Sequence, residues 1–263
     1  MTRAGVTRVG VFGAGGRMGA MVCAAVAADP DLSLVAAVDP VHADEKLEPV
    51  GVPGGLTVSA DREAMAEAGA EVAVDFTVAS AAAANAGWCA RNGVHAVIGT
   101  TGLSAEELAE MKALFEASNA NCVVAPNFAI GAVLMMRFAE LAAPWFETVE
   151  VIELHHDSKL DAPSGTALLT AARIGSAREQ PPVEAEPLPA RGVEGAPGVR
   201  VHSVRLRGLV AHQEVLFGTT GQVLTLRHDS LDRASFMPGV LLAIKQVAGR
   251  RGFTVGLDPL LGF

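Results

Sequence analysis

The first periodic segment of the chain reads Val6-Thr-Arg-Val-Gly-Val-Phe12 and runs directly into Gly13-Ala-Gly-Gly-Arg-Met-Gly19. The β-branched run is typical of a buried strand, and the alanine-rich run that follows, to Ala28, is typical of a helix. A second strand, Ser33–Val38, ends on Asp39, at about the 20-residue distance that the motif requires. This order predicts a dinucleotide-binding βαβ unit, with the helix N-terminus at the pyrophosphate and the acid at the ribose hydroxyls.

The glycine spacing departs from strict G-x-G-x-x-G, because Met18 fills the usual third position and the glycine follows at Gly19. Arg17 stands at the helix start, where a cation reaches a phosphate; an ordinary surface arginine is the alternative reading. Asp39 is followed by Pro40 rather than by a basic residue. An unaccompanied aspartate repels the 2′-phosphate of NADP, so the sequence favours NADH, and Arg17 keeps NADPH open.

Strands and helices then alternate, which predicts a parallel, doubly wound sheet. The expected strands lie at Leu56–Ser59, Glu71–Thr77, His95–Gly102 and Cys122–Phe128. The expected helices begin at Asp61, run through Ala81–Ala84, and start after Ser104, where Glu107 completes a capping box.

Three strand ends carry turn residues, and ligands of such sheets bind at the carboxyl ends of strands. They are Asp75-Phe-Thr77, Gly99-Thr-Thr-Gly102 and Ala125-Pro-Asn-Phe128. We expect them to line the nicotinamide half of the cofactor site. For Thr77, Thr100 and Thr101 the alternative is an ordinary role in a turn.

The alternation of single strands and helices ends after Asn127. A long apolar helix and a strand that carries two histidines precede a second helix, and three closely spaced strands come later. These elements lie at Ile130–Ala143, Thr148–His156, Ala167–Arg173, Arg200–Arg207, His212–Gly218 and Gln222–His228. They predict an open mixed sheet of about four strands whose uncovered face and edges favour packing between subunits. The Pro-, Glu- and Gly-rich run 179–198 is interpreted as a surface loop.

The helix Ser235–Ala248 and the tail Phe253–Gly256 return to the character of the first half. We therefore expect an α/β protein of two domains, one of them discontinuous. Residues 1–127 and 233–263 would form a Rossmann-like dinucleotide-binding domain. Residues 128–232 would form an α+β domain for substrate binding and oligomerisation.

The most polar stretch is Glu153-Leu-His-His-Asp-Ser-Lys-Leu-Asp-Ala-Pro-Ser-Gly-Thr166. His155 and His156 stand where a strand ends, and neighbours on a strand face opposite ways, so the two are expected to do different jobs. Lys159 follows on the turn, and Ser164 is a candidate N-cap of the next helix. A helix N-terminus beside cationic groups predicts a pocket for a small anionic substrate. The alternative is a solvated polar loop.

Composition excludes other classes. No run approaches the ~18 to 20 apolar residues of a membrane span, and the net charge of −9 argues against nucleic acid. The three cysteines lack metal spacing and read as buried free thiols of a cytoplasmic protein. His202, His212 and His228 lack metal spacing with each other or with His155 and His156, so no metal is expected. His42 and His95 are interpreted as incidental surface or core histidines.

These motifs together resemble bacterial dihydrodipicolinate reductases, and the tail His228–Phe236 is most similar to actinobacterial members. The resemblance implies NAD(P)H-dependent reduction of 4-hydroxy-tetrahydrodipicolinate, a cyclic dicarboxylate, in lysine and diaminopimelate biosynthesis. It also implies a homotetramer with the C-terminal sheets at its centre. Many members carry an acid followed by arginine where this chain has Asp39-Pro40, which puts NADP preference in doubt.

The resemblance assigns roles to individual residues. It makes His155 the catalytic acid/base and Lys159 the proton donor. The substrate carboxylates would be held by His156, Ser164, Gly165 and Thr166. The nicotinamide cofactor would be bound by Gly13, Ala14, Gly15, Gly16, Arg17, Met18, Asp39, Phe76, Thr77, Gly99, Thr100, Thr101, Ala125, Pro126, Asn127 and Phe128.

Two other functions are alternatives to the reductase activity. A regulatory Rossmann protein that binds NADH without turnover would need no cationic pocket. A different two-domain dehydrogenase, acting on aspartate or a semialdehyde, is the second alternative. A semialdehyde dehydrogenase would need a catalytic cysteine in a polar setting, whereas Cys89 and Cys122 fall in a helix and at a strand start.

Overall fold

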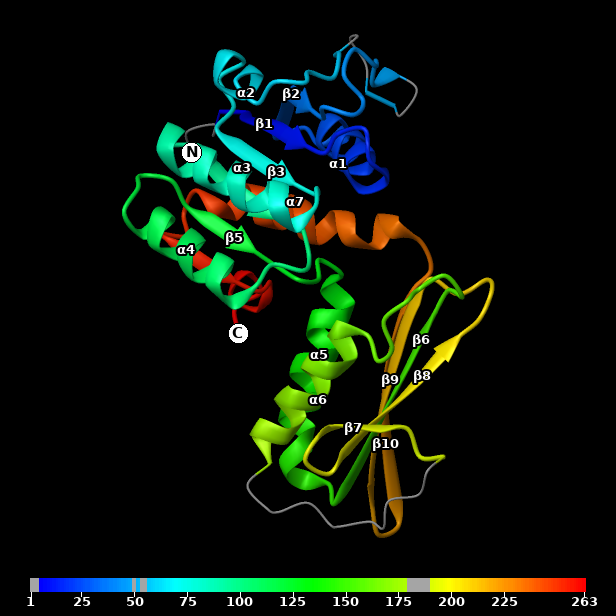
Figure 1. Cartoon of the computed structure of the whole chain (residues 1–263). Coiled ribbons are helices and arrows are strands. Elements are labelled where there is room, and N and C mark those ends of the chain that lie inside the picture. The colour runs from blue at the N-terminus through cyan, green and yellow to red at the C-terminus, as the bar shows by residue number, and fades with distance from the viewer. Residues whose placement is uncertain (1–4, 49–50, 53–55, 179–189) are drawn as a thin grey trace. The chain divides into compact units, whose positions relative to one another are not determined.

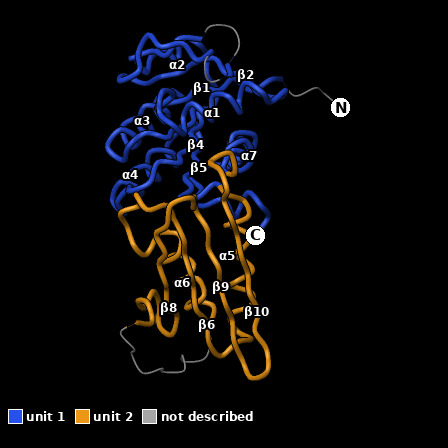
Figure 2. The backbone as a smooth tube through the Cα atoms, turned by 90° about the vertical axis from the view of Figure 1, so that its right-hand side faces the viewer, with its two compact units in different colours: residues 1–128, 236–263 blue, residues 129–235 orange. Residues whose placement is uncertain are grey.

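The computed structural model describes residues 5–48, 51–52, 56–178 and 190–263. The chain divides into two compact units. Unit 1 contains residues 1–128 and 236–263, and unit 2 contains residues 129–235, coloured blue and orange in Figure 2. The chain leaves unit 1 after residue 128 and returns to it at residue 236.

Unit 1 is built on a six-stranded sheet in which every pair is parallel, in the order β11-β5-β4-β3-β1-β2. The chain starts inside the sheet at β1 and adds strands on both sides, so the predicted doubly wound architecture is confirmed. The strands are β1 (Thr7–Phe12), β2 (Leu32–Val38), β3 (Val72–Asp75), β4 (His95–Ile98), β5 (Cys122–Val124) and β11 (Phe253–Val255).

Helices α1 and α7 pack together, as do α3 and α4 (Figure 1). The helices of unit 1 are α1 (Arg17–Ala28), α2 (Ala64–Glu67), α3 (Ala79–Asn92), α4 (Ala105–Glu116) and α7 (Met237–Val247), with the 3₁₀ turn η4 (Asp258–Leu260). The predicted capping box of α4 is present, with both the Ser104 and the Glu107 hydrogen bonds. Apolar side chains such as Phe12, Ile98 and Phe115 fill the space between the sheet and its helices.

The expected strand Leu56–Ser59 is wrong. Thr57 makes one antiparallel bridge to Lys46, and Ser59 makes one parallel bridge to Val38. Backbone hydrogen bonds join the segment to residues 44–47 on one side and to residues 37–39 on the other, so its pairing changes partner and forms isolated bridges instead of a strand. The helix expected from Asp61 begins at Ala64.

Unit 2 contains a five-stranded sheet in the order β10-β9-β6-β8-β7. Strands β6 and β8 run parallel and the other pairs antiparallel, so the sheet is mixed as expected. Helices α5 and α6 lie side by side against it (Figure 1). The elements are α5 (Ile130–Ala142), η2 (Ala143–Trp145), β6 (Thr148–His155), α6 (Gly165–Ala177), β7 (Val193–Ala196), β8 (Val199–Arg205), β9 (Ala211–Thr219), β10 (Gln222–Ser230) and η3 (Arg233–Phe236).

The fifth strand, β7, falls inside the run 179–198 that was expected to be a loop. Residues 179–189 of that run lie outside the described part, and residues 193–196 pair with β8. Because β7 contains a glycine, its sequence lacks the alternation of apolar and polar residues that predicts a strand. The glycine is needed there because a Cβ at Gly195 would lie 2.9 Å from the Cβ of Ala171 on α6.

Asn121, just before β5, joins the C-terminal segment to the rest of unit 1. Its Nδ2 donates to the carbonyls of Val247 and Ala248 at 3.1 and 2.9 Å, at the end of α7. Its Oδ1 accepts from the Gly252 N–H at 3.0 Å, shortly before β11. One nearly buried amide thus satisfies backbone groups that a helix end leaves without partners.

Replacing Asn121 with alanine should lower the free energy of unfolding by about 1–3 kcal/mol, because buried backbone groups lose their partners. Urea titration of the full chain measures the change. Asn92→Ala is the matched control, since that exposed amide makes one bond, to the carbonyl of Trp88. An Asn121 variant as stable as the control would contradict the role given to this side chain.

Candidate functional site

The glycine-rich turn after β1 is shaped for close backbone approach. Gly13 has φ +72°, and a Cβ there would lie 2.8 Å from the carbonyl oxygen of Phe76. A Cβ at Gly19 would lie 1.9 Å from the carbonyl oxygen of Gly13, which explains why the third glycine stands at 19. Helix α1 begins at Arg17 with Gly16 as N-cap and no side-chain cap. A bare helix N-terminus behind a glycine turn fits a pyrophosphate.

Asp39 lies where the sequence predicts, at the end of β2. Its carboxylate is nearly buried and accepts hydrogen bonds from the N–H groups of Gly15 at 3.1 Å and Val41 at 3.0 Å. These bonds aim the carboxylate at the glycine turn. Arg17 and Pro40 are exposed.

His42, for which the sequence predicts no role, lies beside the glycine turn. A Cβ at Gly15 would lie 2.2 Å from His42 Cγ, so the imidazole packs directly on that glycine. Its Nδ1 lies 3.1 Å from Glu45 Oε1. The only signal in the sequence was its position three residues after Asp39.

Asp75 ties the carboxyl ends of β3 and β4 together. One oxygen accepts from the hydroxyls of Thr77 and Thr100, both at 2.7 Å, and the other accepts from Asn85 Nδ2 at 2.8 Å. The Thr77 N–H donates to Thr100 Oγ1 at 2.9 Å. Thr77 and Thr100 therefore stabilise these turns, and the buried acid that organises them is Asp75, at a strand end that was expected to line the cofactor site.

Phe76 and Phe128 form the apolar part of the same edge, with ring centroids 5.8 Å apart. A Cβ at Gly99 would lie 2.2 Å from the Phe76 ring, so this glycine makes room for the aromatic side chain. Residues from the turn after β1 and the ends of β3 and β4 are thus brought together. Of the others predicted here, Thr101 and Pro126 are exposed, Asn127 is half-buried and Ala125 is buried.

In unit 2 a buried carboxylate, that of Glu153, lies near the end of β6. Glu153 is 0% exposed. It pairs with His155 Nδ1 and, through both oxygens, with the Arg205 guanidinium at 2.8 and 2.9 Å. It also accepts from the Ser164 N–H at 3.2 Å. Glu153 and Arg205 were missed, although Glu153 stands two residues before His155 and thus on the same strand face.

The residues after β6 form a turn that carries the cations. His156 Nδ1 lies 2.8 Å from Ser158 Oγ, and the Lys159 N–H donates to the His156 carbonyl at 3.2 Å. Lys159 Nζ pairs with Asp161 at 2.7 Å. The two neighbouring histidines therefore have different partners.

Helix α6 begins at Gly165 with Ser164 as its N-cap, as predicted. The Ser164 hydroxyl accepts from the Ala167 N–H at 3.2 Å, so it is engaged in the cap. Gly165 is exposed and Thr166 is half-buried. Behind them, buried Gln213 donates to Thr170, whose hydroxyl donates to the Thr166 carbonyl, each at 2.8 Å. These two hydrogen bonds stabilise the first turn of α6.

Burial, together with the neighbouring cations, keeps the pKa of His155 below its usual value, so the ring is neutral at neutral pH. Burial lowers the pKa of His155; Glu153 opposes this, and the positive charges of Lys159 and Arg205 add to it. Burial would raise the pKa of Glu153, but hydrogen bonds from Arg205, Ser203 and His155 outweigh burial and keep that pKa below its usual value. The carboxylate is therefore ionised and the imidazole uncharged.

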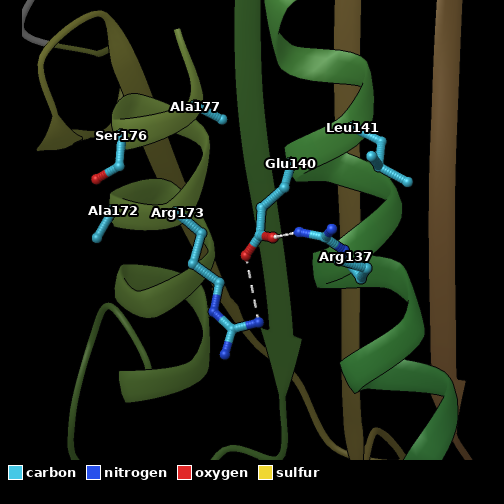
Figure 3. Close-up of a pocket in the computed structure, with 7 residues that line it drawn as sticks. All are labelled: Arg137, Glu140, Leu141, Ala172, Arg173, Ser176 and Ala177. Carbon is cyan, nitrogen blue, oxygen red and sulfur yellow. Dashed lines mark hydrogen bonds and ion pairs between the residues drawn. The ribbon is translucent and has the colours of Figure 1, made fainter. Parts of the chain in front are cut away.

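A hollow of about 410 Å³ opens between α5 and α6. Figure 3 shows Glu140 placed between Arg137 and Arg173, at 2.7 and 3.3 Å from their NH1 atoms. Arg137 Nε finds no hydrogen-bond partner within the described residues. None of the predicted site residues lines this hollow.

Two other histidines of unit 2 are paired with acids. His202 lies 2.6 Å from Glu150, and His212 lies 2.6 Å from Asp229. Within the residues that the structure describes, no group of His, Cys, Asp and Glu could hold a metal ion.

The thiols of Cys23, Cys89 and Cys122 are free and buried. Burial raises the pKa of all three, that of Cys23 to about 12. Thiolate chemistry at neutral pH is therefore disfavoured. No helix in the described part is long and apolar enough to cross a membrane.

Comparison with known proteins agrees with this geometry. Residues 7–128 match the family model for the N-terminus of dihydrodipicolinate reductase, and residues 131–261 match the model for its C-terminus. The chain is 52% identical to the 4-hydroxy-tetrahydrodipicolinate reductase of Nocardia farcinica, covering 97% of this chain and 98% of that one. It is 48% identical to the enzyme of the same name from Streptomyces coelicolor, with 97% of each covered.

Among solved structures, a dipicolinate-bound dihydrodipicolinate reductase from Paenisporosarcina sp. TG-14 superposes with a TM-score of 0.82. The two sequences are 42% identical, and the match covers 97% of this chain and 99% of the other. Both halves of the chain, in sequence and in fold, lead to one conclusion: it belongs to the dihydrodipicolinate reductase family.

Proposed function

We propose that this chain reduces 4-hydroxy-tetrahydrodipicolinate to tetrahydrodipicolinate with a nicotinamide cofactor, a step of lysine and diaminopimelate biosynthesis. The observation that carries the proposal is the grouping of His155, His156 and Lys159 with the N-terminus of α6 around the end of β6. A regulatory protein that only binds a dinucleotide has no need of such a cationic pocket. Relatives about 50% identical over nearly the full length carry the name of this activity.

Unit 1 has the features that a nicotinamide dinucleotide needs. The cofactor supplies the hydride for the reduction. The glycine turn and the start of α1 would hold its pyrophosphate, and Asp39, aimed at that turn, would take the ribose hydroxyls. The strand ends at Phe76, Thr77 and Gly99–Thr101, with Ala125–Phe128, would line the nicotinamide half.

Unit 2 has the features that a small dicarboxylate needs. The first N–H groups of α6, at Gly165 and Thr166, offer hydrogen bonds and positive potential to one carboxylate. His156 adds a further donor beside it. Ser164 contributes by capping the helix and keeping its first turn in place.

Reduction adds a hydride and a proton to the substrate and releases its 4-hydroxyl as water, so the protein has to supply a proton. Lys159 is the donor, because its ammonium group also stabilises the negative charge that develops on the ring. His155 enters the reaction as a neutral imidazole, able to accept or share a proton at Nε2. Asp161 holds the Lys159 ammonium in place.

We further propose that the chain works as a cytoplasmic homotetramer. Support for assembly comes from exposed apolar side chains of unit 2, namely Val204 on β8, Leu206 directly after β8 and Val223 on β10. Such apolar positions along an open sheet are suited to packing between subunits. The buried free thiols are suited to a reducing compartment.

Replacing Lys159 or His155 with alanine should lower kcat by at least about 100-fold, since each removes a group that handles the proton. Initial rates of cofactor oxidation with freshly prepared 4-hydroxy-tetrahydrodipicolinate measure the loss. Lys112→Ala, at an exposed ion pair on α4, is the control and should keep full activity. Full turnover in both site variants, with circular dichroism unchanged, would refute the assigned roles.

NADH should be used with a higher kcat/KM than NADPH, because the Asp39 carboxylate repels a 2′-phosphate and Pro40 offers no compensating charge. Asp39→Asn keeps an acceptor for the Gly15 N–H and removes the charge, so it should raise the NADPH/NADH ratio by about tenfold, or 1.4 kcal/mol.

Asp44→Asn changes an exposed acid nearby and should leave the ratio unchanged. A wild-type preference for NADPH would mean that Arg17 binds the phosphate and that the interpretation of Asp39-Pro40 is wrong.

A further inference from the structure

The buried Glu153 carboxylate joins several parts of the candidate substrate site. Its Oε1 accepts from the Ser164 N–H and from Arg205 NH2, and its Oε2 accepts from Arg205 NH1 and pairs with His155 Nδ1. The start of α6, the end of β6 and strand β8 are therefore held by one side chain. No exposed surface remains on this carboxylate for water to compete.

Arg205 lies directly opposite His155 in the parallel ladder between β6 and β8. Besides its bidentate pair with Glu153, its guanidinium donates from Nε to the Lys159 carbonyl at 3.3 Å and from NH2 to the Asp161 carbonyl. The planar, forked guanidinium can do both at once, which a lysine cannot. Arg205 thus fixes the backbone of the turn that carries Lys159.

The protonation of His155 follows from these contacts. An ionised carboxylate only accepts hydrogen bonds, so the hydrogen in the Glu153 contact belongs to Nδ1 of the imidazole. A neutral ring with hydrogen on Nδ1 leaves the lone pair on Nε2. The atom that faces away from Glu153 is then the one that can take or share a proton.

We propose that Glu153 and Arg205 are positioning residues of the reaction, with Glu153 holding His155 in the Nδ1–H tautomer and Arg205 locking both that carboxylate and the Lys159 turn. The proposal rests on the proposed function for its kinetic consequences and on the structure alone for the tautomer. Neither residue needs to touch the substrate. Each acts through His155 or Lys159.

The same strand supplies a matched control. Glu150 on β6 pairs with His202 on β8 at 2.6 Å and with Arg191, so it repeats the set of one acid, one histidine and one arginine. It contacts neither the Lys159 turn nor the start of α6 in the contacts that the structure describes. Glu150→Gln therefore disturbs a similar network without reaching the candidate site.

The first test reads the tautomer directly, without any turnover. The ¹⁵N shifts of the imidazoles in the full-length protein, at a pH where the rings are neutral, distinguish Nδ1–H from Nε2–H. The His155 signals are assigned by their loss in His155→Gln. We expect Nδ1–H in the wild type and in Glu150→Gln. In Glu153→Gln the amide can donate to Nδ1, so the Nε2–H form should appear.

The second test is kinetic. Glu153→Gln should lower kcat at least about 100-fold with the KM for the cofactor unchanged, whereas Glu150→Gln should match the wild type. The charged groups facing His155 are Glu153, Lys159 and Arg205. Removing the one negative charge should move the His155 limb of the pH–rate profile to lower pH. Arg205→Lys should retain more activity than Arg205→Gln, because it preserves the charge beside Glu153.

An unchanged tautomer in Glu153→Gln, or equal losses in the Glu153 and Glu150 variants, would overturn the proposal. Should Glu153→Gln not fold, the ¹⁵N shifts of the wild type still decide the tautomer, and an Nε2–H ring at His155 would overturn the proposal. A wild-type protein that fails to reduce 4-hydroxy-tetrahydrodipicolinate would refute the proposed function, while the ¹⁵N shifts would still decide the positioning claim.

Discussion

A negative charge without solvent contact is the constraint on which unit 2 depends. Leaving such a carboxylate unpaired costs several kcal/mol, so the chain around Glu153 has to supply donors from fixed directions. The guanidinium of Arg205, the ring of His155 and the N–H of Ser164 are those donors. Satisfying one buried acid therefore sets the geometry of a strand end, a turn and a helix start at once.

Unit 1 also contains a buried acid, Asp75. Its oxygens accept hydrogen bonds from two threonine hydroxyls and an amide. In both units a buried acid organises the loops that follow the strands, and the groups proposed to meet ligands lie on those loops. Short turns supported in this way hold their side chains with little freedom. This is the kind of support that precise hydride and proton transfer requires.

The sequence predicted what depends on local pattern. The glycine turn, the doubly wound sheet, the capping box at Ser104 and the cap at Ser164 all follow from spacing and residue type. What it missed depends on contacts between distant residues. Glu153 and Arg205 lie 52 positions apart, and no local signal pairs them. Strand β7 was not predicted because it contains Gly195, where a Cβ would collide with Ala171 of α6. The strand predicted at Leu56–Ser59 was wrong because the bridges of that segment reach two different partners.

The strand order of unit 1 has a consequence for how the protein is made. Strand β11 pairs with β5, and α7 packs on α1, yet both follow the whole of unit 2 in the chain. During synthesis, residues 129–235 leave the ribosome as one continuous stretch before α7 and β11 have been made. The parallel sheet of unit 1 stays without its last strand until residues 253–255 have been made. A chain that stops before β11 therefore leaves one edge of β5 unpaired, and β11 closes that edge.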